Sequence, residues 1–92
     1  ITGYWITEKN GATIKVFAID KNLRYRIPFN EPGDVISYLR SIYDRVSEST
    51  VVVYGDDGEK FGMWPGTKEW VVEKGYLHKL FDALHSEKDW LE

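Results

Sequence analysis

The stretch that decides the fold is VVVYGDDGEKFGMWPG, residues 51–66. An apolar, β-branched run at residues 50–54 leads into two adjacent carboxylates, Asp56 and Asp57, and then into a glycine-rich loop. A short continuous run of this kind is typical of a strand covered on both faces, as in a parallel sheet. In α/β proteins, ligand and catalytic groups follow the carboxyl ends of such strands. We therefore expect the two aspartates at a functional edge of a sheet.

The residues before this stretch predict a β-hairpin. Strand-like runs at residues 4–7 and 13–19 flank Asn10-Gly11. This dipeptide is a strong signal for a two-residue turn, because both central positions of a type I′ turn need positive φ. Residues 21–29 are then expected to be irregular.

Helical periodicity is clearest between Pro32 and Val46. Apolar residues recur there every three or four positions, which predicts a helix with one apolar face. Pro32 suits the first turn, and Asp34 favours the positive end of the helix dipole. The polar residues 47–49 end the pattern. Since a strand, a helix and a second strand follow one another, with a crossover of about 17 residues, we expect a right-handed βαβ unit.

After residue 66 the sequence predicts two further helical segments. Thr67 is a candidate N-cap for a helical turn that ends near residue 73. Gly75 interrupts the pattern, and a helix is expected over residues 76–85. Four apolar side chains of this helix are expected to face inward: Leu77, Leu80, Phe81 and Leu84. The predicted fold class is α/β, with a β-hairpin followed by helix, strand, loop and helix.

The composition excludes several classes of function. Because the chain of 92 residues begins with Ile1 rather than Met, we expect residues 1–92 to be a single segment of a larger domain. A net charge of −3 differs from the basic surface of a nucleic-acid binder. No apolar run approaches the roughly 18 residues that span a membrane. The chain has no cysteine, which is compatible with the reducing cytoplasm where we expect the protein.

Metal chemistry is not favoured by the acidic stretch. YGDD at residues 54–57 resembles the metal-binding turn of viral RNA-dependent RNA polymerases, in which a second antiparallel strand follows the aspartates. Here glycines and a proline between residues 58 and 66 oppose a strand. The two histidines, His78 and His85, have no acidic or cysteine cluster arranged around them. We expect no metal site and no cofactor.

Carboxylates beside aromatic side chains suit carbohydrate chemistry. A glycosidase needs one carboxyl group to protonate the leaving oxygen and another as nucleophile or base. The acid must keep its proton, which burial or a like charge favours. Asp56 and Asp57, with Phe61 and Trp64 behind them, are candidates for such an environment. Trp64 would either stack on a sugar ring or pack within the protein, and the aspartates would alternatively form a solvated turn.

A longer stretch resembles a known family. DDGEKFGMWPGTKEWVVEKGYL resembles the fourth conserved region of glycoside hydrolase family 57 and the residues that follow it. The family includes thermophilic α-amylases and 4-α-glucanotransferases. Upstream, GYWITE, LRYRIPF and VISYLRSI resemble the segment that precedes this region in the 4-α-glucanotransferase branch. The resemblance runs from about residue 3 to residue 84.

This resemblance implies a fold, an activity and a set of site residues. The catalytic domain of the family is a distorted (β/α)7 barrel that acts on α-1,4-glucans with retention of configuration. The general acid/base of the motif falls on Asp57, and the tryptophan that lines the sugar subsites falls on Trp64. Asp56, Glu59 and Lys60 match further motif positions and would support the substrate site, with Lys60 expected to pair with a carboxylate.

Two departures from the family pattern matter. The family usually has histidine before the aspartate pair, whereas this chain has Gly55. The family's nucleophile is a glutamate from an earlier region, and Glu8, Glu31 and Glu48 all lie in other contexts. Because double displacement needs both carboxyl groups, we predict that the 92 residues alone are catalytically inert.

The expected partners follow from these inferences. They are an α-1,4-glucan or maltooligosaccharide, and the remainder of the parent barrel. Exposed sheet edges also predict self-association of the isolated segment, since unpaired strands recruit partners. The alternative to an enzyme fragment is a non-catalytic carbohydrate-binding or structural α/β module.

Overall fold

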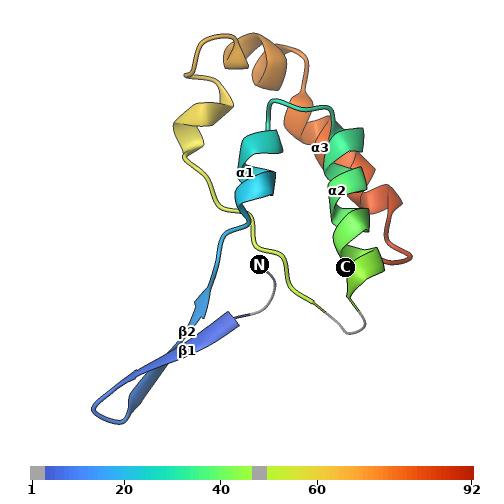
Figure 1. The fold of residues 1–92 in the computed structure, drawn as a ribbon. Helices are drawn as coiled ribbons and strands as arrows, with labels where there is room; N and C mark the ends of the chain where they lie inside the picture. Colours follow the sequence, from blue (N-terminus) through green and yellow to red (C-terminus); the bar gives the residue numbers. More distant parts are fainter. Residues whose placement is uncertain (1–3, 47–49) are drawn as a thin grey trace.

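The computed structural model describes residues 4–46 and 50–92, which form a β-hairpin arm and a body of helices (Figure 1). The molecule measures 49 × 31 × 17 Å. The elements in chain order are the strands β1 (Tyr4–Lys9) and β2 (Ala12–Phe17), the helices α1 (Lys21–Arg26) and α2 (Pro32–Arg45), the 3₁₀-helix η1 (Gly58–Phe61), the π-helix η2 (Lys68–Glu73) and the helix α3 (Tyr76–Ser86). The predicted break at residues 47–49 lies outside the described residues.

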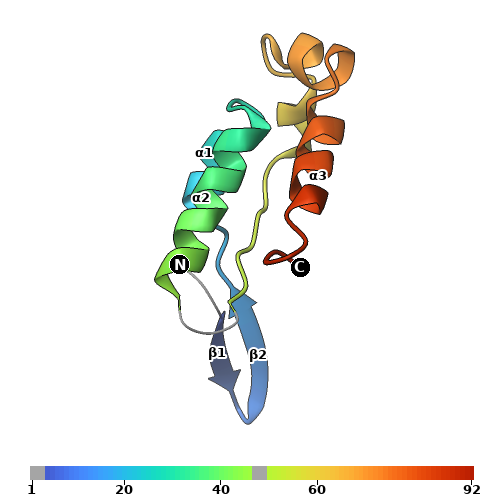
Figure 2. The ribbon, with the colours of Figure 1, turned by 90° about the vertical axis from the view of Figure 1, so that its right-hand side faces the viewer.

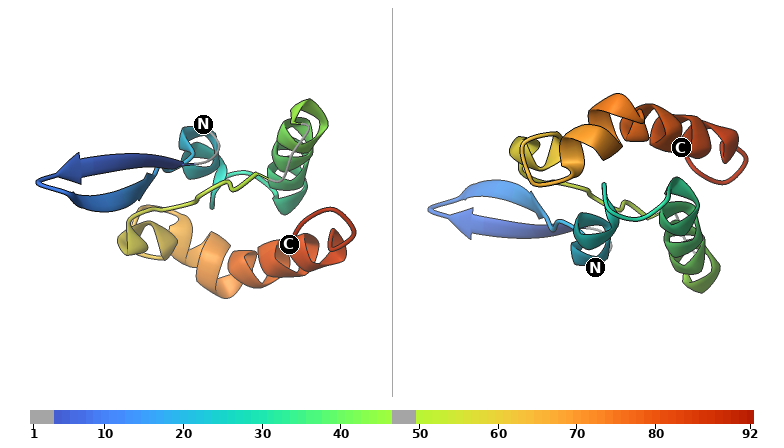
Figure 3. Two further views of the ribbon diagram at one scale, coloured as in Figure 1. Left: turned by 90° about the horizontal axis from the view of Figure 1, so that it is seen from below. Right: turned by 90° about the horizontal axis from the view of Figure 1, so that it is seen from above.

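The predicted hairpin is confirmed, with slightly different strand ends. β1 pairs antiparallel with β2, from Tyr4 opposite Phe17 to Lys9 opposite Ala12. Asn10 and Gly11 have φ values of 54° and 83°, as a type I′ turn requires. Both strands are exposed along their whole length, and Figure 3 shows the hairpin extending away from the helices. The arm therefore contributes no buried side chain to the core.

The prediction that residues 21–29 are irregular was wrong, because α1 forms there. The carboxylate of Asp20 accepts a hydrogen bond from the backbone N–H of Leu23 at 2.9 Å and so caps the helix. Arg24 and Arg26 lie in the last turn, at the negative end of the helix dipole. Only Leu23 is buried among the six residues, so no apolar period marked this helix in the sequence.

The expected strand at residues 50–54 is only partly formed. Val53 makes a single parallel bridge with Ile19, and its carbonyl accepts a hydrogen bond from the backbone N–H of Asp20 at 2.7 Å. In the part of the chain that the structure describes, no ladder extends this bridge, and Val51 is exposed. Figure 2 shows the segment as an extended stretch that passes the helical body. The pairing is parallel as expected, but the segment is not a strand covered on both faces.

The helices enclose one apolar core. α2 begins at Pro32 and carries Asp34 in its first turn, as predicted. The core consists of side chains from α1, α2, η2 and α3 and from the chain just after α1: Leu23, Ile27, Val35, Val71, Tyr76 and Leu80. Each such burial contributes about 1.5–3 kcal/mol to folding. The core therefore fixes α1 against the other helices, and α1 supports the site described below.

α3 confirms one predicted helix and corrects one detail. The helix starts after Gly75, which has φ 68°, and Leu80 is buried while Leu77 and Leu84 pack against the core. Phe81 was expected to face inward, but it is exposed. It follows Leu80 directly and so lies about 100° around the helix from it, outside the apolar face.

Tyr76 shows how the polar end of a buried aromatic residue is accommodated. Its hydroxyl group donates a hydrogen bond to the carbonyl oxygen of Asn30 at 2.6 Å. Burial raises the pKa of Tyr76 to about 12, so the hydroxyl group remains a neutral donor at physiological pH.

The described residues do not test the predicted barrel. The sheet among residues 4–46 and 50–92 has two strands and does not close into a barrel, so the (β/α)7 barrel stays a prediction. Large apolar side chains are exposed on the hairpin and on α3, among them Trp5, Ile6, Ile14 and Phe81. Exposed apolar surface of this extent is typical of an interaction face. Among the described residues, no helix combines the length and apolar character that crossing a membrane requires.

Candidate functional site

The acidic motif folds back on itself through one 3₁₀ turn. Asp57 stands at the N-cap position of η1, and its carbonyl accepts a hydrogen bond from the backbone N–H of Lys60 at 3.1 Å. This turn returns the Lys60 side chain to Asp56, where its Nζ lies 2.5 Å from Oδ2. The expectation that Lys60 pairs with a carboxylate is confirmed.

Lys60 is a buried cation with several partners. Its side chain is 4% exposed, and its Nζ also donates a hydrogen bond to the carbonyl oxygen of Arg24 in α1. The rings of Phe29 and Trp64 lie 5.0 Å and 6.0 Å from the ammonium group. A buried charge is tolerated only when it is paired and hydrogen-bonded. Lys60 therefore joins the acidic motif to α1.

Asp56 is the buried anion that matches Lys60. Its side chain is 1% exposed, and it accepts hydrogen bonds from the Tyr54 hydroxyl group at 3.0 Å and from the backbone N–H of Asp57 at 2.9 Å. Burial by itself raises the pKa of Asp56, but these bonds and the one from Lys60 outweigh it, so the pKa lies below its usual value. Asp56 is thus held as a carboxylate, which is unsuited to donating a proton.

Asp57 has a different environment from its neighbour. Its side chain is 58% exposed, and its Oδ2 accepts a hydrogen bond from Nη2 of Arg24 at 3.3 Å. The burial expected around a proton donor is therefore not present among the described residues. The two aspartates are adjacent in sequence, yet one is a fixed internal anion and the other is accessible to a ligand.

Trp64 lines a hollow beside this pair. Its ring is stacked on Phe29 with 6.2 Å between the ring centroids, and the residue stays 40% exposed. The hollow has a volume of about 550 Å³, and its lining is aromatic, aliphatic and cationic: Ile19, Lys21, Arg24, Tyr25, Phe29, Lys60 and Trp64. Trp64 therefore lies at the edge of an open hollow that Lys60 of the acidic motif also lines. Phe61 instead packs against the core.

Glu59 and Gly55 complete the motif. Glu59 lies in the first turn of η1 and is exposed, and its carboxylate makes no ion pair within residues 4–46 and 50–92. At Gly55, a Cβ atom would lie 2.9 Å from Cδ1 and 3.2 Å from Cγ1 of Ile19. Ile19 therefore fills the space that a larger side chain at this position would need.

The geometry also bears on the metal hypothesis. The described residues contain no cluster of three or more histidine, cysteine, aspartate or glutamate side chains suited to a metal ion. Two protein cations, Lys60 and Arg24, already contact the carboxylates of Asp56 and Asp57. His78 is on the exposed surface of α3, with Nε2 3.4 Å from Asp82. The acidic motif is thus built as ion pairs between side chains.

Three residues of this site were not predicted from the sequence. Arg24 and Phe29 lie within residues 21–29, which were expected to be irregular. Tyr54 was predicted only as the end of a strand. Arg24 and Phe29 belong to LRYRIPF, residues 23–29, where closely spaced basic and aromatic residues are a sequence signal for a binding surface. Three of its residues, Arg24, Tyr25 and Phe29, line the hollow in the folded chain.

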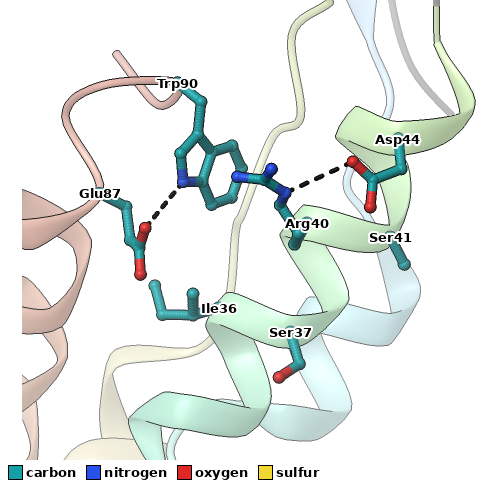
Figure 4. Close-up of a pocket in the computed structure, with 7 residues that line it drawn as sticks. All are labelled: Ile36, Ser37, Arg40, Ser41, Asp44, Glu87 and Trp90. Atoms are coloured by element: carbon teal, nitrogen blue, oxygen red, sulfur yellow. Dashed lines mark hydrogen bonds and ion pairs between the residues drawn. The ribbon is translucent and has the colours of Figure 1, made fainter.

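A second hollow lies between α2 and the last residues of the chain (Figure 4). It has a volume of about 460 Å³, and Arg40 and Trp90 are among its lining residues. Arg40 lies 3.4 Å from Asp44 and 5.1 Å from the Trp90 ring, and the indole N–H of Trp90 donates to Glu87 at 2.7 Å. These polar groups pair with one another and hold the last residues against α2.

Comparison with known proteins places this geometry in context. A model of the family described as glycosyl hydrolase family 57 matches residues 2–92. An α-amylase of Pyrococcus furiosus is 53% identical over 87 residues, and a 4-α-glucanotransferase of Thermococcus kodakarensis is 51% identical over 84 residues. These matches cover 92% and 91% of this chain but 13% of each relative.

A solved structure agrees with the sequence matches. The crystal structure of a 4-α-glucanotransferase from Thermococcus litoralis superposes with a TM-score of 0.84 at 50% identity, and it covers 92% of this chain and 13% of that one. The chain therefore spans about one eighth of the length of the relatives it matches. The family resemblance identified in the sequence is confirmed.

Proposed function

The chain belongs to glycosyl hydrolase family 57, and we propose that it is the part of a retaining, α-glucan-active enzyme that supplies the general acid/base. The enzyme would be a 4-α-glucanotransferase or an α-amylase, the names that its relatives carry. The single observation that carries the proposal is the unequal placement of the two aspartates. Asp56 is locked as an anion, whereas Asp57 is accessible beside an aromatic hollow.

In this proposal Asp57 acts twice. As a carboxylic acid it gives its proton to the glycosidic oxygen while a nucleophilic carboxylate attacks the anomeric carbon, and the leaving sugar departs as an alcohol. As a carboxylate it then takes a proton from water or from a sugar hydroxyl group, whose oxygen displaces the enzyme from the anomeric carbon. Water gives hydrolysis, and a sugar acceptor gives transfer.

The nucleophile would come from the remainder of the parent protein. Glu8 accepts a hydrogen bond from Gly11 in the hairpin turn, and Glu31 precedes α2. Glu48 lies outside the described residues. Neither Glu8 nor Glu31 belongs to the acidic motif, so we propose that the 92-residue chain alone releases no sugar from maltooligosaccharides.

The substrate would be an α-1,4-glucan or a maltooligosaccharide. Sugar rings have apolar faces that pack on aromatic side chains, and the stacked pair of Phe29 and Trp64 lines the hollow near Asp57. Asp56 and Lys60 would support this site as a buried ion pair beneath the exposed residues that contact the sugar. Glu59, which is exposed on the same turn, would contact the glucan directly.

The test is Asp57→Asn in the full-length protein, with Asp82→Asn on α3 as the matched control. Loss of general acid/base catalysis predicts a fall of about 10²–10⁴-fold in turnover of maltooligosaccharides. An α-glycosyl fluoride needs no protonation of its leaving group, so the first step should survive in the variant. Added azide should then attack the glycosyl-enzyme without general-base catalysis, which restores turnover and gives an α-glycosyl azide as product. Near-wild-type turnover of Asp57→Asn on maltooligosaccharides would remove Asp57 from this role.

A further inference from the structure

We propose that Arg24 is a positioning residue that holds the carboxylate of Asp57 in its working orientation, an inference that rests on the proposed role of Asp57. The guanidinium group contacts both aspartates of the motif. Its Nε lies 3.3 Å from Oδ1 of Asp56, and its Nη2 lies 3.3 Å from Oδ2 of Asp57. One planar group thus spans the fixed anion and the accessible one.

The base of Arg24 is itself held in place. α1 is capped by the buried carboxylate of Asp20 and anchored in the core by Leu23. The carbonyl oxygen of Arg24 also accepts a hydrogen bond from the buried ammonium group of Lys60. Backbone and side chain of the same residue therefore both contact the acidic motif, which limits the positions that the guanidinium group can take.

Asp57 depends on this contact for its orientation. Its side chain is more than half exposed, and within residues 4–46 and 50–92 Arg24 is the only residue whose side chain forms a hydrogen bond or ion pair with its carboxylate. An exposed carboxylate without such a contact samples several rotamers. Because a displacement of about 1 Å at a reacting group can lower the rate 10²-fold, orientation by Arg24 matters for the reaction.

The chemistry of this contact requires arginine. A guanidinium group presents several N–H donors in a rigid plane, whereas the ammonium group of lysine is a single point charge. Lysine at position 24 would reach one aspartate but would not span both. The side chains of Arg24 and Asp57 are 46% and 58% exposed, so their ion pair contributes little to stability. The buried carboxylate of Asp56 keeps its ion pair with Lys60 when Arg24 is replaced. Replacing it should therefore alter catalysis without altering the fold.

Arg24 also lines the hollow, so direct contact with the substrate is the competing role. The two roles differ in their kinetics. Removing a residue that binds substrate and transition state equally raises KM without changing kcat. Removing a residue that orients the acid/base lowers kcat and leaves KM unchanged, because the ground-state complex does not use the proton.

The experiment measures kcat and KM of the full-length protein on maltooligosaccharides for Arg24→Lys and Arg24→Ala. We expect kcat to fall about 10- to 100-fold in both variants, with KM and the melting temperature unchanged. Guanidinium ion at millimolar concentration should restore part of kcat in Arg24→Ala. The matched control is Arg26→Lys on the same helix, where the arginine contacts the Asn22 carbonyl and the Tyr38 ring instead. Its kcat should equal that of the wild type.

Two outcomes would overturn this inference. They are a wild-type kcat in both Arg24 variants, and a raised KM at unchanged kcat, which would make Arg24 a substrate contact. The result for Asp57→Asn separates this failure from that of the proposed function. If Asp57→Asn loses turnover while the Arg24 variants keep it, only the positioning role fails. If Asp57→Asn keeps turnover, the proposed function fails first.

Discussion

The hairpin arm and the carboxylate site are held together by different kinds of contact. The hairpin pairs residues around one turn, from Tyr4–Phe17 to Lys9–Ala12, and its strands are exposed throughout. The site joins Arg24 to Asp57 and Lys60, which are 33 and 36 positions away in the sequence, and it buries an ion pair. Damage to the hairpin should therefore stay local, whereas loss of the buried Asp56–Lys60 pair should destabilise α1 and the core beside it.

The largest effect is expected for Lys60→Met. The substitution leaves the Asp56 carboxylate buried without its cation and removes the hydrogen bond to the Arg24 carbonyl. Breaking a buried pair from one side costs about 3–5 kcal/mol of unfolding free energy. Chemical denaturation of the chain, followed by circular dichroism, measures this loss.

A second lysine–carboxylate pair provides the control for Lys60→Met. Lys74 lies 3.4 Å from Glu69, but both side chains are exposed. Lys74→Met should change the unfolding free energy by at most about 1 kcal/mol, because exposed pairs contribute little. Equal losses in the two variants would show that burial of the Asp56–Lys60 pair has no energetic consequence.

Acid should produce a smaller loss at the same site. The pKa of Asp56 is lower in the folded chain than in the unfolded one. The unfolded chain therefore binds the proton first as the pH falls. The contribution of Asp56 to stability is present above its unfolded value, about pH 4, and is lost as the pH falls through the folded value.

This pH dependence is measured by comparing the wild type with Asp56→Asn. The variant should be the less stable protein at pH 7, and the difference in unfolding free energy should shrink as the pH falls below about 4. A difference that stays constant from pH 7 to pH 2 would mean that ionisation of Asp56 is not what stabilises the site.

The same contrast explains which parts of the fold were predictable. Asn10-Gly11 specifies its turn through backbone geometry alone, and the periodicity after Pro32 specifies an amphipathic helix. Both signals are local and need no partner. α1 was missed because a six-residue helix with one buried side chain carries no periodic signal. It is stabilised by the Asp20 cap and by the core.

The site, like the fold, was predictable only where a local stretch of sequence carries the signal. The family resemblance led us to expect that Lys60 pairs with a carboxylate, and in the structure its partner is Asp56. The apolar run at residues 50–54 suggested a buried strand, but a strand forms only where neighbouring strands pair with it, and here Ile19 supplies one bridge. Arg24 was not predicted because no local pattern indicates an ion pair across 33 positions.

A third prediction concerns Gly55, where the site meets the end of the hairpin arm. Gly55→Ala places a Cβ atom 2.9 Å from Cδ1 of Ile19. Overpacking of this kind costs about 1–3 kcal/mol unless the neighbour moves. The double variant Gly55→Ala/Ile19→Ala should recover most of the loss, because the neighbour's side chain is removed.

Gly58 is the matched control for Gly55. It begins η1 in the same loop, and a Cβ atom there would meet nothing within 4 Å. Gly58→Ala should leave the unfolding free energy unchanged or raise it by about 0.4–1 kcal/mol through the less flexible unfolded chain. If Gly58→Ala destabilises the chain as much as Gly55→Ala does, the cause is backbone conformation in the loop and not the contact with Ile19.

The smallest effect on folding is expected in the hairpin arm. Ile14 is exposed on β2, so Ile14→Lys should change the unfolding free energy by no more than about 0.5 kcal/mol. Its effect should appear in association instead. The chain is expected to self-associate through the hairpin, because two unpaired strand edges carry large exposed apolar side chains. A lysine on this arm opposes such pairing by charge repulsion and by the loss of apolar surface.

Sedimentation velocity over a range of concentrations should show a lower average mass for Ile14→Lys than for the wild type. Thr13→Lys adds the same charge to the same strand without removing a large apolar side chain, and its average mass should lie between the two. A wild-type chain that stays monomeric at every concentration would mean that this exposed arm does not recruit a second copy.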